Sequence, residues 1–135
     1  MNWKLIFELS LFGLAMGIAT VFIIPSRIEP LFWLAIFIFC AYVIAKRCAN
    51  RHFLHGLLVS IVNSVWITGA HVLLVNQYIA RHPQEAAMMQ SMPAGLSPRL
   101  MMALTGPVIG VISGLVLGLF SWVAARLVRR SVQPA

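Results

Sequence analysis

Four long runs of apolar residues, separated by polar connections, dominate the pattern along this chain. They predict helices at about residues 5–24, 30–46, 53–79 and 99–125. A helix needs about 20 apolar residues to cross the roughly 30 Å of hydrocarbon in a bilayer. We therefore predict an all-α integral membrane protein in which residues 1–135 form a single domain, a bundle of four transmembrane helices surrounded by lipid.

The longest polar connection, residues 80–98, joins the third and fourth runs. It contains Pro83, Pro93 and Pro98, and the stretch from Gln84 to Met92 consists of residues compatible with a helix and has no breaker. A short helix in such a connection suits the membrane interface. We predict an external loop that carries a short interfacial helix.

Composition narrows the class of protein further. Apolar residues make up 61% of the chain and charged residues 10%, and the mean hydropathy is +0.92. A soluble domain of this size needs a larger polar exterior, and a chain this apolar does not stay disordered. Two cysteines are also too few for a disulfide scaffold. These classes are excluded in favour of a membrane protein.

The net charge of +7 comes mainly from basic residues placed between the apolar runs. Seven lie on one side of the predicted membrane (Lys4, Lys46, Arg47, Arg51, Arg126, Arg129 and Arg130) and three on the other (Arg27, Arg81 and Arg99). Under the positive-inside rule, this bias places both termini in the cytoplasm of a multi-pass bacterial inner-membrane protein. It also argues against nucleic-acid binding, which needs a basic patch on a soluble face.

Polar residues recur along one face of the third run. With 100° of rotation per residue, an arc of roughly 140° contains Ser60, Asn63, Ser64, Thr68 and His71. Unpaired polar groups are costly in hydrocarbon, so this face must meet protein or water. We favour interhelical hydrogen bonds, which contribute about 0.6 kcal/mol each. The alternative is a polar cavity in which His71 is the ionisable group.

Glu8 is the acidic residue that falls inside an apolar run, and a carboxylate within a membrane points to function by default. Lys4 precedes it by four residues, which is the spacing of an ion pair on one helix face. So near the predicted cytoplasmic boundary, Glu8 can also reach water. A boundary carboxylate is the favoured interpretation, and an intramembrane functional group is the alternative.

Small residues form a regular strip on the fourth run, with the spacing of a glycine zipper. Gly106, Gly110, Gly114 and Gly118 recur every four residues and predict a groove in which another backbone packs closely. The first run has a smaller version of this face, with Gly13 and Gly17. We expect the first helix to fill the groove, while a second copy or another membrane protein remains an open alternative.

Signatures of catalysis are absent from the sequence. It has no HExxH, GxSxG or phosphate-binding glycine loop, and three acidic residues leave little for acid–base chemistry. We expect no enzyme, cofactor or metal centre. A weaker alternative is copper binding by the thioethers of the external segment, namely Met88, Met89, Met92, Met101 and Met102, with His82 nearby.

This layout of four spans, with a polar third and a glycine-rich fourth, resembles small bacterial inner-membrane families of four helices to which no chemistry is assigned. Phe7, Glu8, Leu9 and Gly13 are also similar to the first helix of small multidrug-resistance transporters. Glu8 lies nearer the end of its helix than in that family, and the long external loop is foreign to it.

Two functions therefore compete. The leading hypothesis is a structural or interaction protein that assembles through its glycine-rich faces. The alternative is a small transporter or channel subunit that uses Asn63, His71 and Glu8. A packed polar face on the third helix favours the first hypothesis, whereas a cleft that reaches His71 favours the second.

Overall fold

The computed structural model describes residues 1–91 and 95–130, and helices are the only regular secondary structure in this part of the chain. The helices are α1 (Trp3–Phe22), α2 (Glu29–Arg47), α3 (His52–Leu73), α4 (Val75–Arg81), α5 (Pro83–Gln90) and α6 (Pro98–Arg130). By length and composition, α1, α2, α3 and the Pro98–Val128 part of α6 could each cross a membrane. The prediction of an all-α chain with four candidate spans is confirmed.

The helix ends follow local sequence signals. At the start of α1, the Asn2 side chain accepts a hydrogen bond from the Leu5 amide, which satisfies one of the free donors of the first turn. Pro30 lies at the beginning of α2, where its missing N–H costs nothing. The Ser97 hydroxyl accepts from the Leu100 amide at 3.2 Å as α6 begins at Pro98. Serine followed by proline therefore starts the fourth span.

The third predicted helix differs from the observed one. Instead of continuing to residue 79, α3 ends at Leu73, and α4 follows after Leu74. Aromatic rings line the break: the ring centroids of His71 and Tyr78 lie 4.6 Å apart, and the Tyr78 ring stacks on His82 at 4.2 Å. Beyond the break, α4 packs against α1 and α5.

A short helix is also present in the long connection, but its bounds differ from the predicted ones. It begins at Pro83, one residue before the predicted start, and ends at Gln90. Met92, the predicted end, lies outside the described residues. The proline at the first turn explains the earlier start, because a helix does not need the N–H that proline lacks at this position.

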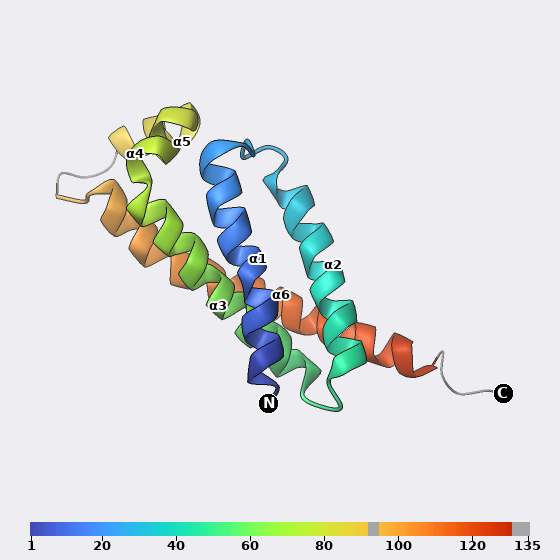
Figure 1. The fold of residues 1–135 in the computed structure, drawn as a ribbon. Helices are drawn as coiled ribbons and strands as arrows, with labels where there is room; N and C mark the ends of the chain where they lie inside the picture. Colours follow the sequence, from blue (N-terminus) through green and yellow to red (C-terminus); the bar gives the residue numbers. More distant parts are fainter. Residues whose placement is uncertain (92–94, 131–135) are drawn as a thin grey trace.

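The third span is the centre of the arrangement (Figure 1). Its most extensive contacts are with α6, and on another side it packs against α1. Most of the contacts of α2 are with α6, and it meets α1 and α3 much less. The first two helices are joined by a short connection, yet they diverge from each other (Figure 1).

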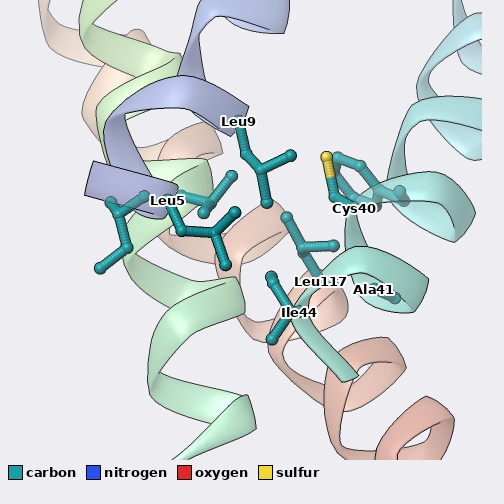
Figure 2. Packing of buried hydrophobic residues seen from close by; sticks show 9 residues of the cluster. Leu5, Leu9, Cys40, Ala41, Ile44 and Leu117 are labelled. Atoms are coloured by element: carbon teal, nitrogen blue, oxygen red, sulfur yellow. The ribbon is translucent and has the colours of Figure 1, made fainter. Parts of the chain in front are cut away.

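The apolar core gathers at one end of the molecule, where the N-terminus and the connection between α2 and α3 lie (Figures 1 and 2). All four spans contribute to it, through Leu5, Ile6, Leu9, Phe37, Cys40, Ala41, Ile44, Val59 and Leu117. By contrast, residues 29–36 of α2 include no buried residue. The molecule is packed at this end, which we call the closed end, and is more loosely associated at the other.

The glycine strip of α6 packs against α3. A Cβ atom added at Gly106 or Gly110 would collide with the side chains of Thr68 or Ser64, and the strip continues toward the closed end against Leu57 and Phe53. The expectation that α1 fills this groove is wrong, because α3 occupies it. Regular glycine spacing identifies a face for close approach but not the helix that approaches it.

The two glycines of α1 also face α3. A Cβ atom at Gly13 would lie 2.7 Å from the Cα of Asn63, and one at Gly17 would lie 3.1 Å from the Cα of Ile67. Helix α3 is therefore held between two glycine-bearing neighbours. This arrangement brings its polar residues into close contact with the backbones of α1 and α6.

Candidate functional site

A cleft of about 790 Å³ opens between α2, α3 and α6. Its volume lies within the range of about 300–1,000 Å³ that is typical of small-molecule sites. The lining from α3 contains every residue of the predicted polar face, namely Ser60, Asn63, Ser64, Thr68 and His71. Apolar groups, including Phe37, Ile109, Ile112, Val116 and Phe120, complete the lining. The site thus has a polar stripe on one wall and apolar side chains on the opposite wall.

The same polar face also joins neighbouring helices. The hydroxyl groups of Ser60 and Ser113 lie 2.8 Å apart and link α3 to α6. The Thr20 hydroxyl of α1 lies 2.9 Å from Nε2 of His71. Part of the hydrogen-bonding capacity of the stripe is therefore used between helices, and the same residues border the cleft.

Asn63 is the residue of this stripe whose hydrogen bonding is incomplete. Its side chain is 2% exposed, and its Oδ1 accepts a hydrogen bond of 3.0 Å from the Gly13 amide. Because an N–H group must meet the oxygen, this contact fixes which amide atom is Nδ2. That nitrogen has no hydrogen-bond partner within the described part of the chain. A buried donor without a partner costs about 1–3 kcal/mol, so Asn63 invites an acceptor.

At the end of the cleft away from the closed end, α2, α4 and α5 contribute lining residues, and we call this end the mouth. Two of these residues carry carboxylates. Glu29 begins α2 and accepts a hydrogen bond of 3.1 Å from the indole N–H of Trp33. Glu85 in α5 accepts one of 2.6 Å from the hydroxyl of Ser26. That bond holds the pKa of Glu85 below its usual value.

Both of these charges affect the pKa of the Tyr78 hydroxyl. Burial, together with the negative charges of Glu85 and Glu29, raises the pKa of Tyr78 to about 12. Tyr78 therefore stays a neutral hydrogen-bonding group in the lining of the mouth at physiological pH. Two carboxylates border this region, although the chain as a whole carries a net charge of +7.

Sequence reasoning missed Glu29 and Glu85. A signal was present, because the chain has three acidic residues and two of them fall on the less basic side of the predicted membrane. They lie 56 positions apart, however, and spacing along the chain does not reveal that α2 and α5 meet at one cleft. Only the packing of the helices brings them together.

Glu8 lies apart from this site. Its carboxylate is 3.8 Å from the Lys4 ammonium, and both side chains are well exposed at the N-terminal end of α1. Glu8 does not line the cleft. The predicted grouping of Glu8 with Asn63 and His71 therefore does not occur in the structure, and the Lys4 pair matches the boundary interpretation.

The methionines of the external segment lie in different surroundings where the structure describes them. Met89 and Met102 line the cleft, Met88 is exposed, and Met92 lies outside the described residues. Within residues 1–91 and 95–130, no three His, Cys, Asp or Glu side chains come together as metal ligands. Thioether binding of copper stays a prediction of the sequence.

Comparisons with known proteins provide no assignment for this site, since no protein-family model, curated protein or solved structure matches the chain. The resemblances in layout to small four-helix membrane proteins remain expectations. The function of the site must be argued from its own residues and their geometry.

Proposed function

We propose that this chain is a non-enzymatic inner-membrane protein that binds a small amphipathic molecule in the cleft between α2, α3 and α6. The observation that carries the proposal is the cleft itself, with a polar stripe from Ser60 to His71 facing an apolar wall. A molecule with a polar end and a hydrocarbon part complements both surfaces. This function develops the transporter hypothesis, with Glu29 and Glu85 in the place of Glu8.

The packing of the molecule supports binding with access from one side. Around Leu117, which is fully buried, the side chains of all four spans shut the closed end. Around Trp33 and Leu34, α2 lines the cleft without being buried. A ligand can enter at the mouth, and passage to the other side would require separation of the core around Leu117.

We further propose that the four spans form a transmembrane bundle with both termini in the cytoplasm. The N-terminus and the connection between α2 and α3 lie at the same end of the molecule, where the basic residues are most numerous (Figure 1). With this orientation the mouth faces the periplasm, and α5 lies at the periplasmic surface of the inner membrane. The positive-inside rule supports this arrangement.

Assembly with another protein is the second candidate function, and α6 is the element that favours it. Its glycine strip is filled by α3. Its other faces nevertheless expose large apolar residues along the whole length of the helix, among them Leu104, Val108, Leu115 and Leu119. A second copy or a different membrane protein would bind there, in competition with lipid.

A titration followed by NMR tests the binding function. The protein, labelled with ¹⁵N in a neutral maltoside detergent, is titrated with 1-dodecanol while the indole N–H signals are observed. Trp33 lines the cleft, whereas Trp3 is 64% exposed at the opposite end. We expect a saturable shift of the Trp33 signal and little change at Trp3.

A matched pair of variants ties this shift to the cleft. Ile112 lines the cleft and is 59% exposed, whereas Leu115 is 47% exposed and lies outside the lining. Ile112→Trp should fill the space and abolish the Trp33 response, and Leu115→Trp should preserve it. If dodecanol gives no saturable response, or if both variants behave alike, the cleft is not a binding site.

A further inference from the structure

Within the described residues, the carboxylates at the mouth form no salt bridge, although the charge of His82 favours the ionised form of Glu85. In the described part of the chain, the Lys4–Glu8 pair is the salt bridge that forms, and neither Glu29 nor Glu85 takes part in one. Each accepts a hydrogen bond from one neutral side chain, Trp33 for Glu29 and Ser26 for Glu85, and a backbone hydrogen bond also reaches Glu85. A carboxylate has about four acceptor positions, so most of its capacity remains available at each site.

The nearby basic groups are directed elsewhere. Arg81 donates a hydrogen bond of 2.8 Å to the Phe22 carbonyl and lies over the Phe22 ring. His82 is buried, and its Nδ1 lies 2.9 Å from the carbonyl of Tyr78. Arg27 and Arg99 are exposed and form no salt bridge with either carboxylate. Two oriented negative charges are therefore left open to a positive group from outside the chain.

A second, independent observation points to a ligand. The Nδ2 of Asn63, nearly inaccessible to solvent, has no acceptor in the described part of the chain. Asn63 lines the same cleft as His71, whose ring contacts Tyr78 of the mouth. Because Asn63 precedes His71 by eight residues, it lies about 12 Å further along the helix, away from the mouth. The cleft thus combines acceptors at its mouth with a vacant donor deeper inside.

On the basis of the binding function proposed above, we propose that the cleft takes an amphipathic ammonium compound. Its positively charged head lies between Glu29 and Glu85, and a carbonyl or ether oxygen further along the molecule accepts a hydrogen bond from Asn63. Trp33 lines the cleft with an aromatic ring, which also favours a cation. The hydrocarbon part lies along the apolar wall.

Two sources could provide this chemistry: a free long-chain amine that enters from water, or a phospholipid with an amine head group that enters from the bilayer. Both present the same ammonium to the carboxylates. They differ in the groups next to the ammonium, because the phospholipid adds an anionic phosphate and ester carbonyls. The experiment therefore needs one probe of each kind.

The test compares probes of equal chain length in the NMR titration described above. Dodecylammonium, 1-dodecanol and dodecanoate share one hydrocarbon chain and differ in the charge of the head group. We expect dodecylammonium to shift the Trp33 signal with about tenfold higher affinity than dodecanol, and dodecanoate to bind more weakly than both. Equal affinity of the amine and the alcohol would overturn the proposal.

Charge-neutral variants locate the contact. Glu29→Gln and Glu85→Gln should each remove most of the preference for the ammonium while dodecanol still binds. Glu8→Gln changes the charge of the chain by the same amount at the exposed Lys4 pair, so it is the matched control and should leave the preference intact. A loss of preference in Glu8→Gln alone, or in none of the three variants, contradicts the assignment.

The role of Asn63 has its own readout. Methyl 12-aminododecanoate adds an ester carbonyl to the alkylammonium chain, so it should bind more tightly than dodecylammonium and shift the side-chain amide signals of Asn63. If these signals move equally with both probes, Asn63 does not hold the acceptor. The result for the head group is independent of this outcome.

A short-chain phospholipid pair distinguishes the sources. Tighter binding of dihexanoyl phosphatidylethanolamine than of dodecylammonium assigns the cleft to a lipid, and the reverse order assigns it to a free amine. If neither binds better than dihexanoyl phosphatidylglycerol, the ammonium proposal fails. If, in that case, dodecanol still shifts the Trp33 signal and Ile112→Trp abolishes this shift, the cleft binds amphipathic molecules and only the ligand class is wrong. If dodecanol also fails to respond, the binding function itself fails.

Discussion

Gly13 and Asn63 show how one residue sets the chemistry of another. A Cβ atom on Gly13 would lie 2.7 Å from both the Cα and the Oδ1 of Asn63, so glycine is the residue that lets the two helices come this close. The approach brings the Gly13 amide within 3.0 Å of the Asn63 oxygen. That contact occupies the acceptor of the side chain and leaves its donor without a partner in the described part of the chain. Close packing at Gly13 thus sets the hydrogen bonding of Asn63.

Ser26 controls the charge of Glu85. Its hydroxyl donates to the carboxylate at 2.6 Å, and this bond is the main cause of the lowered pKa. Burial opposes it, and smaller favourable effects come from a backbone hydrogen bond and from His82. Ser26→Ala should therefore raise the pKa of Glu85 toward the usual glutamate value. A ¹³C NMR titration of the Glu85 carboxyl group measures the change.

The stability of the folded protein should follow the same shift. A carboxylate whose pKa is lower in the folded state stabilises that state above the unfolded-state pKa, and the contribution is lost as the pH falls through the folded-state value. Ser26→Ala should reduce this contribution at neutral pH and leave stability below both pKa values unaffected by this linkage. Ser91→Ala is the control, because the exposed Ser91 hydroxyl donates to the Met88 carbonyl instead. An unchanged Glu85 pKa in Ser26→Ala would contradict this account.

At the scale of elements, periodicity located the faces but not their partners. The polar stripe on α3 and the glycines on α6 could be predicted because each lies on one helix with a regular spacing. That these two faces meet each other could not be predicted, since spacing within a helix carries no information about its neighbour. The break at Leu74 was missed for a related reason: no glycine or proline marks it, and ring contacts between His71, Tyr78 and His82 accompany it.

Two glycines of α3 allow the contact between α3 and α6 to be tested. A Cβ atom at Gly56 would lie 2.6 Å from the Leu117 carbonyl oxygen, so Gly56→Ala must push the helices apart. Overpacking of this kind costs about 1–3 kcal/mol. At Gly69 nothing lies within 4 Å, and the greater helix propensity of alanine should change stability by about +1 kcal/mol at most.

Unfolding of both variants in mixed micelles, with increasing dodecyl sulfate, measures the difference. We expect Gly56→Ala to lower the free energy of unfolding and Gly69→Ala to leave it unchanged or slightly raised. Equal effects of the two substitutions would mean that α3 does not approach α6 as closely as described. The comparison controls for the intrinsic preference of alanine, because both positions lie within one helix.

At the scale of the whole molecule, the presence of two carboxylates at the mouth is a property of the packing and not of any one segment. Ser26, Glu29, Tyr78 and Glu85 come from the first connection, α2, α4 and α5. Their approach depends on the short connection that joins α1 to α2 and on the contact of α2 with α6 near Phe37. Hydropathy predicts that four helices occur, but it does not determine where they separate. The site therefore became visible only in the assembled fold.

Orientation in the membrane is the prediction that belongs to this scale. Seven basic residues lie toward the end that contains the N-terminus and three toward the mouth, so the first end should be cytoplasmic. Asn50 and Leu96 are exposed in the connections at the two ends. In a Cys48→Ser background, a membrane-impermeant maleimide added to spheroplasts should label Leu96→Cys at once. It should label Asn50→Cys only after the membrane is opened.

Neutralising part of the charge tests whether this bias is the cause of the orientation. Changing Lys46, Arg47 and Arg51 to glutamine leaves four basic residues facing three, a difference too small to determine one topology. Labelling without permeabilisation should then appear at Asn50→Cys in part of the population and should fall at Leu96→Cys. If labelling stays unchanged, features other than charge set the orientation. If the labelling pattern is reversed before any charge is changed, the mouth faces the cytoplasm, and the ammonium ligand would have to come from that side.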